Sequence, residues 1–154
     1  MSQSADMGAR PERPPLNPWL RRLIYVVVFE ALAIILASLG LTLLSGAPVA
    51  ETGPVTAITS GIAVAWNFAF NAVFEAWEAR QVVRGRSLAR RLAHAAGFEL
   101  GLTALIVPLF AWWLGVTLIE ALMYDLTLVV FFLVYTFLFN LGFDRVFGLP
   151  ASAR

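Results

Sequence analysis

Four apolar stretches decide what this chain can fold into. They cover Leu23–Ser45, Val55–Phe74, Leu92–Leu114 and Leu126–Phe143. Each has the length of roughly 17–25 residues that crosses the hydrocarbon core of a bilayer as a helix. The composition agrees, because 60% of the residues are hydrophobic and only 14% are charged, against about 25% charged in soluble domains. The sequence therefore predicts an all-α membrane protein with four transmembrane helices, the first of them a retained span.

An internal repeat with an offset of 69 residues groups these helices into pairs. Residues 22–30 (RLIYVVVFE) match residues 91–99 (RLAHAAGFE), and residues 66–75 (WNFAFNAVFE) match residues 135–144 (YTFLFNLGFD). Two matches at one offset predict two tandem helix-pair repeats that run the same way through the bilayer. The expected domains are a flexible cytoplasmic tail (1–18), a first transmembrane pair (19–85) and a second transmembrane pair (86–154).

The distribution of arginine predicts the orientation. All eleven basic residues lie in the N-terminal tail, at the C-terminus, or in and beside the central loop, Trp77–Arg90. The other two loops, Gly46–Pro54 and Gly115–Tyr124, contain none. Cytoplasmic loops of membrane proteins carry the excess of positive charge. We therefore expect both termini and the central loop in the cytoplasm.

Glu30 and Glu99 are the only acids within the four predicted spans. Each lies seven residues past the start of its span, roughly 10 Å below the cytoplasmic edge at 1.5 Å per residue. An ionised acid at the centre of a span costs at least ~2.5 kcal/mol on insertion scales. A carboxyl group in this position can exchange its proton for a positive charge, which is the minimal chemistry of a cation/proton antiporter. The alternative is a neutral structural acid bonded to a neighbouring helix.

The second and fourth predicted helices carry an aromatic row beside an amide row, both repeating every four residues. Aromatic faces attract cations, and buried amides position a substrate or hold helices together. The alternative is that both rows only pack helices. The candidate binding residues on these rows are Trp66, Asn67, Asn71, Tyr135 and Asn140.

Charged residues at the cytoplasmic helix ends stand where the helix dipole disfavours them. Glu75 and Asp144 lie at C-terminal ends, and Arg22 and Arg91 lie at N-terminal ends. Both misplacements are resolved if these acids and arginines pair across helices, as ion pairs or a cytoplasmic gate, although which arginine meets which acid stays open. His94, the only histidine, is expected to make a polar contact or relay a proton.

These motifs resemble the bacterial transmembrane pair repeat, two copies of which make up the proteobacterial antimicrobial compound efflux family. The resemblance covers about Arg22 to Pro150. It implies proton-coupled export of cationic biocides such as chlorhexidine and acridine dyes, and of short diamines in some members, across the bacterial inner membrane. It also implies that Glu30 is the proton-coupling and substrate-binding residue. Tyr25 departs from the family pattern, which has a histidine there.

The predicted mechanism is alternating access, in which Glu30 binds a cation from the cytoplasm and protonation from outside releases it. A passive cation channel and a non-transporting membrane scaffold are the alternatives. An enzyme is disfavoured because one histidine and no cysteine leave no nucleophile–base pair. The expected partners are cationic small molecules, protons and the lipid bilayer, with no cofactor, metal or nucleic acid. Four helices alone enclose little space, which leaves a homodimer open.

Overall fold

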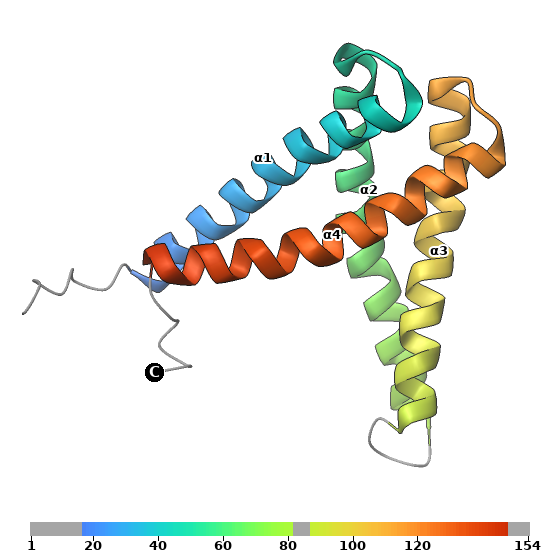
Figure 1. The fold of residues 1–154 in the computed structure, drawn as a ribbon. Helices are drawn as coiled ribbons and strands as arrows, with labels where there is room; N and C mark the ends of the chain where they lie inside the picture. The colour runs from blue at the N-terminus through green and yellow to red at the C-terminus, as the bar shows by residue number, and fades with distance from the viewer. Residues whose placement is uncertain (1–16, 82–86, 148–154) are drawn as a thin grey trace, which may run out of the picture.

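The computed structural model describes residues 17–81 and 87–147, which contain four long helices. They are α1 (Pro18–Ser45), α2 (Val49–Ala79), α3 (Leu88–Leu114) and α4 (Leu118–Phe147) (Figure 1). All four are long and apolar enough to cross a membrane. The predicted all-α fold with four spans is therefore confirmed. The predicted tail, 1–18, lies outside the described residues except at its last two positions, where the Asn17 side chain caps the start of α1.

Each helix pair is closed by a tight turn at an equivalent position of the repeat. α1 ends at Gly46 with φ 73°, and α3 ends at Gly115 with φ 65°. Glycine adopts this left-handed conformation without the penalty that a Cβ atom would bring. In both turns the glycine N–H bonds the carbonyl four residues earlier, which terminates the helix. We call the end of the molecule formed by residues 46–48 and 115–117 the turn end.

The helices are longer than the predicted spans. The predicted loops Gly46–Pro54 and Gly115–Tyr124 are wrong in length, because α2 and α4 begin inside them at Val49 and Leu118. The central loop Trp77–Arg90 is likewise shortened at both ends by α2 and α3. Hydropathy missed the first turns of α2 and α4 because these turns contain polar residues. Each first turn carries a glutamate, however, which favours a helix N-terminus.

The four helices form two arms that join at the turn end and diverge away from it (Figure 1). In one arm α1 lies along α4, and in the other α2 lies along α3. Each arm therefore takes one helix from each repeat. Within a repeat, by contrast, the two helices meet mainly near their connecting turn and belong to different arms.

The buried core lies near the turn end and ties the arms together. Its side chains come from all four helices: Ala37, Leu41, Val55, Ile106, Phe110, Ala121 and Leu128. The outward faces of the helices carry exposed apolar side chains, such as Leu133 at 74% exposure. An apolar surface of this extent suits contact with lipid rather than water. The core joins the arms at one end and leaves space between them further along.

Candidate functional site

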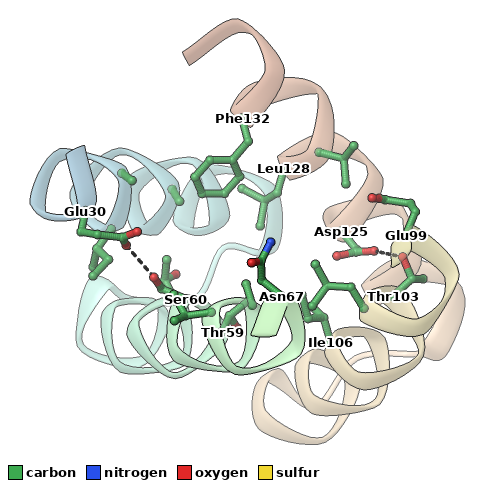
Figure 2. A pocket seen from close by; sticks show the side chains of 18 of the residues that line it. Glu30, Thr59, Ser60, Asn67, Glu99, Thr103, Ile106, Asp125, Leu128 and Phe132 are labelled. Atoms are coloured by element: carbon green, nitrogen blue, oxygen red, sulfur yellow. Dashed lines mark hydrogen bonds between the residues drawn. The ribbon is translucent and has the colours of Figure 1, made fainter. Parts of the chain in front are cut away.

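A cavity of about 590 Å³ lies between the two arms and is lined by all four helices (Figure 2). Most of its wall is apolar, with phenylalanine and aliphatic side chains from each helix. Ligand cavities of this size are commonly apolar with a few placed polar groups. The polar groups that matter here are three acids, two hydroxyls and an amide: Glu30, Glu99, Asp125, Ser60, Thr103 and Asn67.

Glu30 stands on one wall of the cavity, near the middle of α1. Its Oε2 accepts a hydrogen bond of 2.7 Å from the Ser60 hydroxyl of α2. Ala33 and Ala37 follow on the same face of α1 and also line the cavity. Their small side chains leave open the space beside the carboxylate, which is half-buried. The acid predicted to bind cations therefore faces the cavity and has a partner from its own repeat.

A second acidic group stands on the opposite wall (Figure 2). Glu99 and Thr103 lie one turn apart on α3, so both point to the same side of that helix. The Thr103 hydroxyl donates a hydrogen bond of 2.9 Å to Oδ2 of Asp125 on α4. Asp125 is only 5% exposed. This wall thus pairs an acid and a hydroxyl from one repeat, as Glu30 and Ser60 do from the other.

Asp125 was missed by the sequence prediction. The statement that Glu30 and Glu99 are the only acids in the spans is wrong, because the fourth span was taken to begin at Leu126, whereas α4 begins at Leu118 and contains Asp125. The structure places Asp125 seven residues into α4. Helical spacing could have identified Asp125 as a buried acid. Ala121, Asp125 and Leu128 share one face of α4, and all three are buried.

The three acids of the cavity are not arranged as a metal centre. Within residues 17–81 and 87–147, no three His, Asp or Glu side chains come close enough to hold a metal ion. Glu30, Glu99 and Asp125 therefore line the cavity without forming a three-acid coordination point.

The predicted aromatic rows pack the helices of each arm. The Trp66 indole N–H donates to the Phe98 carbonyl at 3.0 Å, joining α2 to α3. The Tyr135 hydroxyl donates to the Phe29 carbonyl at 2.8 Å, joining α4 to α1. Donors and acceptors are each 69 positions apart, so the two arms make the same contact. Among the candidate binding residues on these rows, Asn67 lines the cavity, whereas Trp66 and Tyr135 lie in the arm interfaces.

The remaining predicted amides also link helices within the arms. Asn71 Oδ1 lies 2.8 Å from Nε2 of His94. In the other arm, the Tyr25 hydroxyl donates to Asn140 Oδ1 at 2.6 Å. Tyr25 and His94 are equivalent positions of the repeat, so tyrosine keeps the link that histidine makes. His94 makes the expected polar contact, and its ring also meets Phe74 edge-on, with centroids 4.7 Å apart.

Two glycines let α2 and α3 approach closely. Gly97 faces the ring of Phe70, and Gly101 faces the indole of Trp66. A Cβ atom at Gly101 would collide with that indole. Small residues at this spacing commonly seat a neighbouring helix in membrane proteins. The neighbour here is α2 of the same chain.

The ion pair of the α1–α4 arm uses a different arginine from the predicted one. Arg21 Nη2 lies 2.9 Å from Asp144 Oδ1, and the Arg21 guanidinium also lies over the Phe143 ring at 5.1 Å. Arg22 lies instead over the Trp19 ring, at 5.9 Å. Of the partners left open for Arg22, Asp144 pairs with Arg21 instead, because the helical phase of α1 turns Arg21 toward α4. Of the other two predicted members, Glu75 and Arg91 are both exposed near the far ends of α2 and α3.

Comparison with known proteins identifies relatives over most of the chain. The profile of the family described as chlorhexidine efflux transporter matches twice, over residues 17–80 and 86–149. The short-chain diamines transporter of Acinetobacter baumannii is 32% identical over 126 residues, which cover 82% of this chain and 87% of that protein. The transporter of the same name from Vibrio parahaemolyticus is 35% identical over 125 residues, which cover 81% and 89%. No solved structure matches the chain.

Proposed function

Because this chain belongs to the chlorhexidine efflux transporter family, we propose that it is a proton-coupled antiporter that exports cationic biocides, short-chain diamines or both. The family consists of transporters, so the chain is a multi-pass membrane protein and not an enzyme. The observation that carries the proposal is the position of Glu30. Its carboxylate faces a cavity between two arms and, among the residues that the structure describes, accepts its hydrogen bond from the Ser60 hydroxyl.

Competition between a proton and a cation for the Glu30 carboxylate would couple export of the cation to entry of the proton. An ionised Glu30 attracts a cation into an apolar cavity where a lone charge is costly. A protonated Glu30 has no charge to offer, so the cation leaves. A proton and a cation that share one site exchange across the membrane when the site faces each side in turn.

The arms supply the two access states. The excess of arginine at the ends remote from the turn end favours a cytoplasmic location for those ends. With that orientation the arms of this structure diverge toward the cytoplasm (Figure 1). Glu30 lines the cavity between the arms, so a cation would reach it from that side. Rocking of the arms about the core at the turn end would then expose the same cavity to the outside, as in other transporters built from repeats.

Transport by reconstituted protein tests this function. Proteoliposomes with an imposed pH gradient are expected to move a diamine or chlorhexidine uphill, and Glu30→Gln should lower this transport to the level of empty liposomes. Glu51→Gln is the matched control, because it makes the same substitution at an exposed position in the first turn of α2. Wild-type rates from the Glu30→Gln protein would refute the role of Glu30. Flux that ignores the pH gradient would indicate a passive channel.

A further inference from the structure

We propose that Asp125 is a second anionic subsite of this cavity, which binds one amine of a dication while Glu30 binds the other. The inference rests on the proposed export function and adds to it the side chain that would hold the second amine of a dicationic substrate. It assigns a specificity-determining role to a residue that lies outside the repeated motifs.

The position of Asp125 fits an end group. Figure 2 shows Glu30 and Asp125 on opposite walls, with Asn67 projecting between them. Glu30 on α1 and Asp125 on α4 belong to the same arm, and each accepts a hydrogen bond from a hydroxyl of the other arm, Ser60 on α2 and Thr103 on α3. Asp125 is only 5% exposed, and it lines the cavity. A cation from solution would therefore reach it through the cavity.

The hydrogen bond from Thr103 orients the Asp125 side chain but does not neutralise an ionised Asp125. That bond occupies Oδ2, and a carboxylate has a second oxygen and further lone pairs for a cation. A hydroxyl is a neutral donor, so it leaves the negative charge uncompensated. A buried carboxylate without a cationic partner is costly, and a substrate ammonium group would supply that partner.

The repeat does not account for this acid. The position equivalent to Asp125 is Thr56, whose hydroxyl bonds a carbonyl of its own helix. The position equivalent to Thr103 is Ile34, which also lines the cavity. Each repeat therefore contributes an acid–hydroxyl pair, but the second pair stands about one turn of helix nearer the turn end than a copy of the first would. Two acids at different depths suit an elongated dication better than a compact single charge.

The wall between the two acids suits a methylene chain. Leu128 lies between the two acids in Figure 2, and Ala33 and Ile106 also line the cavity; all three are buried. Burial of methylene groups against such a surface is favourable, whereas an ammonium group there would lack a partner. A cavity of about 590 Å³ also has room for a short diamine.

Binding of two matched amines tests the inference. The purified full-length protein in detergent is titrated calorimetrically with 1,5-diaminopentane and with pentylamine, which has the same chain and one charge. The wild-type protein is expected to bind the diamine about tenfold or more tightly than the monoamine, which corresponds to one added charge pair. Asp125→Asn, which keeps the shape and an oxygen for Thr103, should raise the Kd of the diamine to that of pentylamine and leave the Kd of pentylamine within about twofold.

Further variants separate this subsite from its surroundings. Thr103→Val should reduce the advantage of the diamine in part, because Asp125 then loses its orienting bond. Glu51→Gln, exposed and distant from the cavity, is the control for a changed net charge. The proposal is overturned if Asp125→Asn keeps the full advantage of the diamine, or if Glu99→Gln removes it and Asp125→Asn does not.

Failure of the export function would give a different result. In that case the wild-type protein would still bind the diamine more tightly than pentylamine, and Asp125→Asn would still remove the difference. Proteoliposomes would nevertheless show no uphill movement of either amine under a pH gradient.

Discussion

The two arms are built alike, whereas the two walls of the cavity between them are not. Equivalent residues make equivalent contacts in the α1–α4 and α2–α3 arms, as the bonds of Tyr135 and Trp66 to backbone carbonyls show. The cavity walls instead place Glu30 with Ser60 on one side and Asp125 with Thr103 on the other, at positions that the repeat does not relate. Duplication therefore accounts for the packing, and divergence between the copies accounts for the polar pairs that line the cavity.

The largest effect on export is expected at Glu30 and Glu99, which are equivalent acids of the two repeats in different surroundings. Glu30→Gln should abolish proton-driven export, whereas Glu99→Gln should lower the rate by about tenfold at most, or about 1.4 kcal/mol. Glu30 has a hydroxyl partner from its own repeat, while the hydroxyl next to Glu99, that of Thr103, is bonded to Asp125. Initial rates in proteoliposomes check this. Equal losses in the two variants would show that the acids act as a symmetric pair.

The next effect concerns the close approach of α2 and α3. Gly101→Leu should destabilise the protein by about 1–3 kcal/mol, the usual cost of overpacking, because its side chain would occupy the space of the Trp66 indole. The equivalent position in the other arm already holds leucine, Leu32, which is 41% exposed. Unfolding in detergent, followed by tryptophan fluorescence, measures the change. Leu32→Gly places glycine at the equivalent position of the α1–α4 arm. Because Leu32 is partly exposed, this variant should not destabilise the arm through lost packing against a buried ring.

A smaller effect is expected from the polar links within the arms. Tyr25→Phe removes the hydroxyl that bonds Asn140, and His94→Phe removes the ring nitrogen that bonds Asn71. Each should lower the free energy of unfolding by about 0.5–1.5 kcal/mol, the net worth of one such hydrogen bond. Tyr25→His, which makes the first repeat like the second, should lower it by less than Tyr25→Phe. The same unfolding assay compares them, and a greater loss from Tyr25→His would show that the two arms are not interchangeable at this position.

Much of this architecture could be predicted from the sequence because hydropathy and repetition are one-dimensional signals. The four helices and the choice of Glu30 as a candidate site follow from apolar length and from the cost of a buried charge, and the pairing of the helices follows from the repeat. Asp125 escaped because two acids, Glu120 and Asp125 itself, interrupt the apolar first turns of α4, so the apolar stretch was taken to begin after them. The partners of Trp66 and Tyr135 could not be predicted, for another reason. A sequence repeat does not specify which helix of one copy packs against which helix of the other.

The smallest effect concerns the end of the α1–α4 arm, and it separates two neighbouring arginines. Arg21→Gln should lower the free energy of unfolding by at most about 1 kcal/mol, because the side chains of Arg21 and Asp144 are 21% and 38% exposed and solvent screens their attraction. Arg22→Gln should have less effect, since Arg22 lies over Trp19 on its own helix rather than bridging to α4. Added salt should narrow the difference between the two variants, because it weakens an exposed ion pair. A larger loss from Arg22→Gln would restore the pairing expected from the sequence and would place the helical phase of α1 one residue away from that of the structure.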